Sequence, residues 1–182
     1  MIEHGAEHDI SAVCLTFGDG ANHQSDDCFA PDAVARSIAR LTEAAILCCA
    51  GAGDDYFTHA SAQGMSYPAI LRSTISVGSL YDADLGPIAY SGGAEAYETA
   101  SDRIAPFSQR LHEKVGRGVA TTIFAPAVPT ASTGILNDIG SSIQCGTSQP
   151  AALVTGIVLL VQSLYKRATG QLPSAGLQTP AK

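Results

Sequence analysis

Four short runs rich in apolar and β-branched residues recur along the chain, separated by polar and helical stretches. They are ISAVCLTFG (residues 10–18), AILCCAGAG (45–53), STISVGSL (73–80) and VATTIFAP (119–126). Strands of a buried parallel sheet are apolar on both faces, whereas half-exposed strands alternate. The four runs therefore predict four strands, and at least the first two should be buried.

Two further segments have features of helices. Residues 31–45 open with a proline and carry Val, Ile and Leu at helical spacing. A longer apolar segment runs from about Ser148 to about Thr169 and is followed by a glycine, a typical helix end. Strand, helix and strand within residues 10–53 are typical of a right-handed βαβ unit. The pattern thus predicts an α/β fold on a mainly parallel sheet.

The chain of 182 residues is short enough for a single domain. Residues 81–118 are rich in Gly, Ser and charge, so we expect a long excursion with short β pieces there. We place the domain at residues 1–170. Residues 171–182 have the composition of a linker-like tail.

Composition excludes several classes of partner. The net charge is −7 and no block of Lys or Arg is present, so we expect no binding to nucleic acid or to an anionic membrane. No stretch reaches the roughly 18 uninterrupted apolar residues of a spanning helix, and no signal peptide is recognisable. We therefore expect no membrane partner.

The five cysteines have no metal-ligand spacing, and their odd number argues against a disulfide framework. We expect free, mostly buried thiols, which favours a reducing compartment such as the cytoplasm. The five histidines are scattered, and we expect solvated surface positions for all of them. No metal site and no cofactor are predicted.

The stretch GTSQPAALVTG (residues 146–156) places Ser148 at the predicted N-terminus of the apolar helix. A serine there is either an ordinary N-cap or a nucleophile beside the unpaired N–H groups of the helix start. A second candidate, the Gly-x-Gly at the end of residues 45–53, fits a dinucleotide site poorly. The third glycine is missing, and Asp54 and Asp55 would repel a pyrophosphate.

Several segments, in chain order, resemble the subtilisin-like serine peptidases, the subtilase family. GTSQPAALVTG resembles the nucleophile motif GTS-x-A-[AS]-P-x-V-A-G of that family. HGAEHDISAVCLTFGDG resembles the helix end and the strand that lead into its substrate-binding segment. AILCCAGAGDD resembles the strand that ends in A-A-G-N, and SYPAILRSTISVGS and IFAPAVPTAST resemble later pieces. The resemblance extends from residue 1 to about residue 170.

This resemblance implies a three-layer α/β sandwich and the hydrolysis of peptide bonds by a serine endopeptidase. Ser148 falls on the nucleophile, and Asp54 falls on the Asn that supplies a side-chain donor to the oxyanion hole. Thr16, Phe17 and Gly18 fall on the strand that pairs with the extended backbone of a peptide or protein substrate. The family needs no cofactor for this chemistry.

Two departures from the family pattern bear on activity. The catalytic Asp and His of the family precede the serine in sequence, and neither D-[ST]-G nor H-G-T-H occurs here. We therefore expect the N-terminal part of the fold to be missing and the chain alone to be inactive, because a serine needs an adjacent base. Asp54 is an acceptor when ionised and can donate only when protonated, so any activity should favour acid pH.

Three interpretations of the sequence remain open. The chain is the C-terminal half of a peptidase domain, whose Asp and His come from a missing N-terminal segment or a second chain. Alternatively, it is a non-catalytic pseudopeptidase that binds extended peptides or serves as an interaction module. A third possibility is an unrelated α/β binding domain in which the order of motifs is a coincidence.

Overall fold

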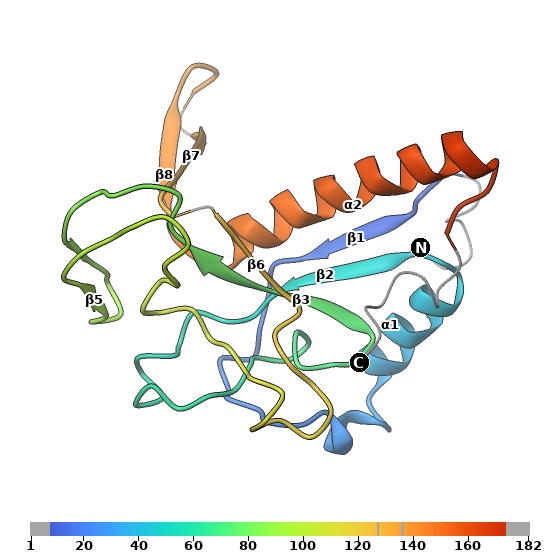
Figure 1. Ribbon diagram of the computed structural model, residues 1–182, viewed down its shortest axis with the longest axis horizontal. Helices are drawn as coiled ribbons and strands as arrows, with labels where there is room; N and C mark the ends of the chain where they lie inside the picture. Colours follow the sequence, from blue (N-terminus) through green and yellow to red (C-terminus); the bar gives the residue numbers. More distant parts are fainter. Residues whose placement is uncertain (1–7, 127, 136, 174–182) are drawn as a thin grey trace.

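The computed structural model describes residues 8–126, 128–135 and 137–173. Its centre is a parallel sheet in the order β1-β2-β3-β6 (Figure 1). The strands are β1 (Ala12–Leu15), β2 (Leu47–Gly51), β3 (Thr74–Leu80) and β6 (Ile123–Pro126). Helices α1 (Ala33–Glu43) and α2 (Ser148–Thr169) pack on the sheet through separate clusters. The predicted α/β class with a parallel sheet is confirmed.

The two faces of the sheet are set by the alternation of side chains along each strand. Cys48 of β2 joins the cluster formed with Ile38 and Leu41 of α1. Its neighbour Cys49 joins the cluster formed with Val154 of α2. Because adjacent residues serve opposite layers, the strand is apolar throughout, which is the pattern that predicted a buried parallel strand.

Helix α1 is shorter than the predicted 31–45. Asp32 is its N-cap, and the carboxylate accepts hydrogen bonds from Val34 N–H (2.9 Å) and Ala35 N–H (3.0 Å). The helix ends at Glu43, and Ala45 has a φ of 61°. The side-chain cap therefore fixes the start of the helix inside the predicted range.

The strands are also shorter than predicted. β1 ends at Leu15, so Thr16, Phe17 and Gly18 lie beyond it as an exposed segment without assigned secondary structure. The prediction that the strand runs to residue 18 is wrong, and so is the prediction that it is buried, because all four residues of β1 are only half-buried. The helix end expected just before this strand falls on residues 1–7, and most of the expected tail falls on residues 174–182. Both lie outside the described residues.

Two hairpins lie outside the main sheet. The predicted excursion contains β4 (Ile88–Ala89) and β5 (Glu95–Ala96), which pair antiparallel. A second hairpin, β7 (Thr130–Thr133) with β8 (Ser141–Gln144), projects away from the domain in Figure 1 and was not predicted. A short 3₁₀ helix, η1 (Asp27–Phe29), was not predicted either. The β7–β8 hairpin leads directly into the start of α2.

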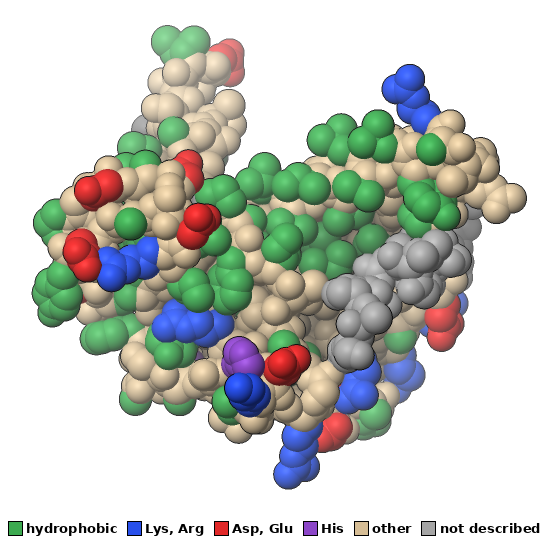
Figure 2. Space-filling model, viewed as in Figure 1, with side chains coloured by type: hydrophobic (Ala, Val, Ile, Leu, Met, Phe, Trp, Pro, Cys, Tyr) green, Lys and Arg blue, Asp and Glu red, His purple; other side chains and the backbone are tan. Residues whose placement is uncertain are grey.

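Helix α2 packs on all four strands of the parallel sheet, yet one side of it is uncovered. Five apolar side chains recur at helical spacing on that side and are 44–66% exposed: Leu153, Ile157, Leu160, Val161 and Leu164. We call these five residues the α2 stripe, and Figure 2 shows hydrophobic side chains gathered along this helix. A helix that is apolar on all sides is normally buried. The α2 stripe is therefore suited to packing against another polypeptide.

By length and composition, α2 is also the one described helix that could cross a membrane, with 22% of its apolar window buried. No spanning helix was expected from the sequence, because its apolar runs are interrupted. It is weak support for a spanning helix, because the opposite side of α2 packs on a sheet whose strands have no place in a bilayer.

All five cysteines are free, as predicted. The expectation that most are buried is wrong, because only Cys48 and Cys49 are buried, whereas Cys28 and Cys145 are exposed and Cys14 is half-buried. The two buried thiols are adjacent in β2 and serve the two faces of the sheet.

Candidate active site

A pocket of about 190 Å³ lies where β1 and β2 end and α2 begins. The carboxyl ends of parallel strands are where α/β folds commonly bind ligands. All five residues singled out from the sequence line it: Thr16, Phe17, Gly18, Asp54 and Ser148. The structure thus brings together segments that are separated by more than 90 residues in the chain.

Ser148 is the first residue of α2 and is half-buried. The N-cap is Thr147, and no side chain caps the helix. The interpretation of Ser148 as an ordinary N-cap is therefore wrong. In the described part of the chain, no hydrogen-bond partner of the Ser148 hydroxyl is found, and neither a histidine nor a carboxylate contacts it as a base would.

Two hydrogen bonds join the end of β2 to the start of α2. Asp54 Oδ1 accepts from Thr147 N–H at 2.7 Å, and Thr147 Oγ1 accepts from Gly53 N–H at 3.1 Å. The two segments approach closely at Gly51, where a Cβ would lie 2.8 Å from Thr147 Oγ1 and 2.9 Å from Thr147 O. Glycine at position 51 is what permits this approach.

The surroundings of the Asp54 carboxyl group, next to the start of α2, shift its pKa. Asp54 is exposed as a residue, yet its carboxyl group lies against the N–H of Thr147, the N-cap of α2, and against Gly146. Burial raises its pKa, and the neighbouring charge of Asp55 raises it further, whereas the hydrogen bonds from Thr147 act in the opposite direction. The protonated form, the only form that can donate a hydrogen bond, is therefore favoured relative to a solvated aspartate.

The segment that carries residues 16–18 is held in place by Asp19. The carboxylate accepts from Ser66 Oγ, Tyr67 N–H and Ala21 N–H, each at 3.0 Å, and pairs with His23 Nε2 at 2.7 Å. Burial alone would raise the pKa of Asp19, but these hydrogen bonds, that from His23 first, lower it to about 2. Sequence reasoning missed this residue, and the only local signal is the Asp-to-His spacing of four.

Two histidines are not the solvated surface residues that were predicted. His23 is half-buried, pairs with Asp19 and meets Phe29 edge to face at 4.9 Å. His59 is half-buried, and its Nε2 donates to Gly20 O at 3.0 Å. Both support the loop that borders the pocket, and neither lines the pocket.

A second, larger pocket of about 480 Å³ shares Asp54 and Asp55 as lining residues. Phe57, Tyr90 and Phe107 give it aromatic walls, and Gln144 and Cys145 border it just ahead of Ser148. The two carboxyl groups thus stand between two adjacent pockets.

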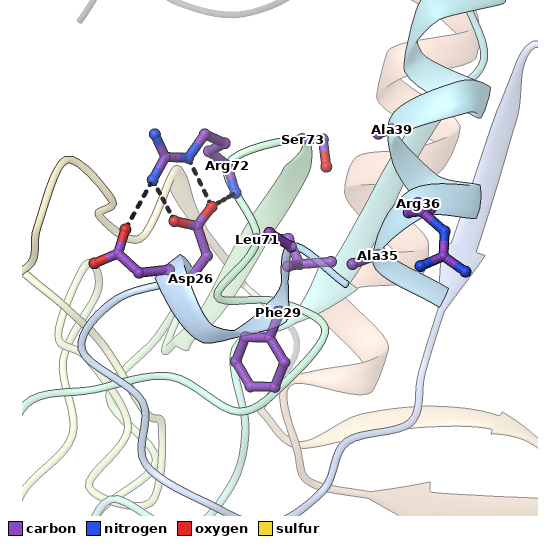
Figure 3. Close-up of a pocket in the computed structure, with 10 residues that line it drawn as sticks. Asp26, Phe29, Ala35, Arg36, Ala39, Leu71, Arg72 and Ser73 are labelled. Atoms are coloured by element: carbon purple, nitrogen blue, oxygen red, sulfur yellow. Dashed lines mark hydrogen bonds and ion pairs between the residues drawn. The ribbon is translucent and has the colours of Figure 1, made fainter. Parts of the chain in front are cut away.

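A separate groove of about 370 Å³ lies between η1, the start of α1 and residues 71–73 (Figure 3). Its main polar feature is the ion pair of Arg72 with Asp26, in which Arg72 Nε donates to Asp26 Oδ2 at 2.7 Å. The two carboxylates that line the groove, those of Asp26 and Asp27, are both within ion-pair distance of Arg72. We attribute a structural role to this pair.

Among the described residues, no group of three or more His, Cys, Asp or Glu side chains could hold a metal ion. The site therefore consists of a helix-terminal serine, an enclosed carboxyl group and an open backbone segment, on a parallel α/β sheet. A parallel α/β sheet with this arrangement is consistent with a subtilisin-like fold.

The model of the subtilase family matches residues 1–179. The chain belongs to the subtilase family, as the sequence resemblance indicated. A search of curated proteins finds no match.

Solved structures with the same fold include several peptide-processing enzymes. For the self-cleaved protease domain of PatA the TM-score is 0.64 and the sequence identity 18%. The match covers 96% of this chain and 53% of the PatA chain. For the prenylagaramide maturation protease PagA the TM-score is 0.61 and the sequence identity 19%; the match covers 96% of this chain and 50% of the PagA chain. For the PatG macrocyclase in complex with peptide the TM-score is 0.62 and the sequence identity 18%; the match covers 96% of this chain and 42% of the PatG chain. The chain therefore spans about half the length of these solved structures, and at this identity the likeness concerns the fold alone.

Proposed function

We propose that this chain supplies the nucleophile and the substrate-binding segment of a subtilisin-like serine endopeptidase. The single observation that carries the proposal is the shared pocket of Ser148, Asp54 and residues 16–18. Membership of the subtilase family supports the same chemistry. The names of the solved structures, which include maturation proteases and a macrocyclase with bound peptide, support a peptide substrate.

Each part of the site has a role in this proposal. The extended substrate lies along residues 16–18, which are exposed and lie outside the sheet, as an added strand would require. Ser148 Oγ attacks the carbonyl carbon while its proton passes to a base. The protonated base then gives that proton to the amine as the C–N bond breaks, which leaves an acyl-enzyme, and water hydrolyses the ester with the help of the same base. Amide groups at the start of α2, and the Asp54 carboxyl group when protonated, face the developing oxyanion.

The base and its orienting carboxylate come from outside these 182 residues, on an additional segment or a second chain. The α2 stripe and the outer edge of β1, which pairs only with β2 among the described strands, are the surfaces on which that polypeptide would pack. An unpaired edge strand can pair with another chain. We call the assembly of this chain with that polypeptide the completed enzyme.

A second candidate function is peptide binding without hydrolysis, as a pseudopeptidase or interaction module. The observation that favours it is Asp54, because an ionised carboxylate beside an oxyanion accepts rather than donates and repels the developing charge. Both functions use the same peptide-binding segment. The division into residues 1–170 as domain and 171–182 as linker stays a prediction under either.

Two experiments test the proposal. The first looks in the DNA around the gene for an in-frame segment, or a separate gene, that encodes the D-[ST]-G and H-G-T-H motifs. The second measures labelling by a fluorophosphonate at pH 4 and pH 8, with Ser148→Ala as the matched control. We expect no Ser148-dependent labelling of the isolated chain and clear labelling of the completed enzyme.

The outcomes separate the two functions. Labelling of the isolated chain that disappears in Ser148→Ala would contradict the need for a second polypeptide. A completed enzyme that binds peptides but is not labelled would overturn the role of Ser148 and favour the binding module.

A further inference from the structure

A buried serine of β3 contacts the backbone close to Ser148. Ser79 is the penultimate residue of β3 and is fully buried. Side chains two residues apart in a strand share a face, and Val77 packs in the cluster formed with Val154 of α2. The Ser79 side chain therefore lies on the α2 side of the sheet, where its Oγ donates to Gly146 O at 2.6 Å. A buried hydroxyl needs such a partner.

The carbonyl that Ser79 contacts belongs to a peptide unit that is held on its other side as well. The N–H of the same unit is that of Thr147, and it donates to Asp54 Oδ1 at 2.7 Å. The C=O and the N–H of a trans peptide point in opposite directions. A donor on one side and an acceptor on the other therefore resist rotation of the Gly146–Thr147 peptide. We call these two hydrogen bonds the peptide clamp.

Helix α2 does not supply a substitute for the bond from Ser79. Pro150 lies four residues after Gly146, where a helical donor would stand, and proline has no N–H. The next residue, Ala151, donates to Thr147 O at 3.2 Å. Among the residues that the structure describes, Ser79 is therefore the donor to Gly146 O. Its loss would leave a buried carbonyl group unsatisfied.

The backbone of Ser79 is itself fixed. Its N–H donates to Ser108 Oγ at 3.0 Å, and its O accepts from Ala105 N–H, also at 3.0 Å. Ser108 and Ala105 are both fully buried. Because Ser79 is bonded on both sides, we expect the Gly146–Thr147 peptide, and not β3, to shift when the hydroxyl is removed.

We propose that Ser79 is a positioning residue for the nucleophile, because its hydroxyl fixes the Gly146–Thr147 peptide and hence the orientation of Ser148, the next residue. The inference rests on the proposed function, since only there does Ser148 attack a carbonyl carbon. Ser79 lines neither of the two pockets that Asp54 borders, so it acts through the backbone and not on the substrate. A misplacement of about 1 Å can cost about 10²-fold in rate.

The first test measures the peptide clamp in the 182-residue chain by amide hydrogen exchange, monitored by NMR. The readout is the exchange rate of Thr147 N–H divided by that of Leu47 N–H. Leu47 N–H donates to Ser11 O at 3.0 Å, at the far end of β2. Global unfolding changes both rates alike, so the ratio reports local opening at the clamp. In Ser79→Ala we expect the ratio to rise about tenfold or more.

Ser76→Ala is the matched control. Ser76 lies in the same strand and is 1% exposed, and its Oγ accepts from Thr122 N–H at 2.8 Å. The control therefore loses a comparable buried hydroxyl, but one that holds the residues ahead of β6 and not the start of α2. The ratio should change less than about twofold in this variant. Ser79→Cys, which keeps a weak S–H donor, should give a ratio between those of the unsubstituted chain and Ser79→Ala. Thermal melting checks that the variants remain folded.

The second test measures fluorophosphonate labelling of Ser148 in the completed enzyme. In Ser79→Ala the maximal rate should fall about tenfold or more. The probe concentration that gives half of this rate should stay within about twofold, because Ser79 does not line the pocket. Ser76→Ala should keep both values within about twofold. This split separates a role in orientation from a loss of probe binding.

A Thr147 ratio that stays unchanged in Ser79→Ala, or that rises equally in Ser76→Ala, would overturn the peptide clamp. A raised ratio with an unchanged labelling rate would overturn the positioning role, since the freed peptide would then have no effect on Ser148. Both changes together, absent in Ser76→Ala, support the proposal. If the unsubstituted completed enzyme shows no labelling that depends on Ser148, the proposed function fails and the positioning role falls with it. The exchange ratio of the 182-residue chain still decides whether the clamp exists.

Discussion

The carboxyl group of Asp54 accepts the backbone N–H of Thr147 at 2.7 Å and so ties the end of β2 to the start of α2. A second hydrogen bond joins the same segments, because the hydroxyl of Thr147 accepts from Gly53 N–H. Because Ser148 is the next residue after Thr147, these two bonds set the position of the proposed nucleophile. We propose, from the sequence resemblance, that the same carboxyl group stands where the family has an amide donor. In that place only its protonated form could donate a hydrogen bond to an oxyanion.

Replacing Asp54 by Asn should increase both stability and reactivity at neutral pH. The amide oxygen still accepts from Thr147, and the amide nitrogen adds a donor that an ionised carboxylate lacks. Loss of one such donor costs subtilisin about 10²–10³-fold in kcat. We expect a gain of up to that order in the fluorophosphonate labelling rate of the completed enzyme at pH 8, measured by gel fluorescence.

The pH dependence of this gain follows from the direction of the pKa shift. The pKa of Asp54 is raised above its ordinary value of 3.8, chiefly by burial, so the folded chain disfavours the ionised form. Its ionisation therefore lowers stability as the pH rises above that value. In urea unfolding, Asp54→Asn should have a higher free energy of unfolding than the unsubstituted chain at pH 7. This difference should narrow as the pH falls toward 4. An advantage that does not change with pH would contradict the assigned role of the carboxyl group.

Substitution of Gly51 by Ala should destabilise the chain. The new Cβ would lie 2.8–3.0 Å from the side chain and backbone of Thr147, so β2 and α2 must separate. Such overpacking typically costs about 1–3 kcal/mol. The matched control is Gly156→Ala in α2, where no heavy atom lies within 4 Å of the new Cβ apart from the neighbouring residues and nearby backbone of the helix itself. That change should stabilise the chain by about 0.5–1 kcal/mol in urea unfolding.

The sequence predicted the parallel sheet and α2 because both leave a local signal. Cys48 and Cys49 are apolar neighbours that serve opposite layers, and only a strand buried on both faces needs that pattern. The boundaries of α2 were predicted correctly, from Ser148 to Thr169, since the glycine that follows adopts the left-handed conformation of a helix end. Family motifs then indicated which residues would meet in the site.

Features that depend on long-range hydrogen bonds could not be predicted. Asp19 holds its loop through Ser66 and Tyr67, almost 50 residues away, and no local pattern marks that contact. Gln109, whose side chain reaches residues 21 and 22, is equally invisible in sequence. The β7–β8 hairpin was missed because its strands are polar and largely exposed, so they lack the apolar signal of a core strand.

Loss of the buried carboxylate of Asp26 should destabilise the chain in a pH-dependent way. Burial would raise the pKa of Asp26, but the hydrogen bonds and charge of Arg72 lower it below 3.8. The stabilisation is therefore present above that value and lost as the pH falls through the lowered pKa. Asp26→Asn should cost about 1–3 kcal/mol at pH 7 in urea unfolding. The cost should shrink as the pH approaches 3.

Asp27 provides the comparison for this prediction. Its side chain is 55% exposed and lies 3.7 Å from the same Arg72. Exposed pairs contribute about 0–1 kcal/mol, so Asp27→Asn should change the unfolding free energy little. Equal effects of the two substitutions would show that the enclosure of Asp26 is not what gives the pair its strength.

The isolated chain should self-associate through the α2 stripe unless a second polypeptide covers it. Contiguous exposed apolar patches mark interaction sites, and this one runs along a helix that is also apolar on its packed side. Light scattering over a range of concentrations should show a mass that rises above that of a monomer. A monodisperse monomer at all concentrations would contradict this expectation.

Substitutions can locate the surface that drives this association. Leu160→Glu with Leu164→Glu places two charges on residues that are about two-thirds exposed, so the fold should tolerate them while association weakens. Ile135→Glu, on the fully exposed tip of the β7–β8 hairpin, removes apolar surface elsewhere and should leave association unchanged. The reverse result would assign the contact to the hairpin. The α2 double variant should also fail to form the completed enzyme, because the proposed second polypeptide packs on the same stripe.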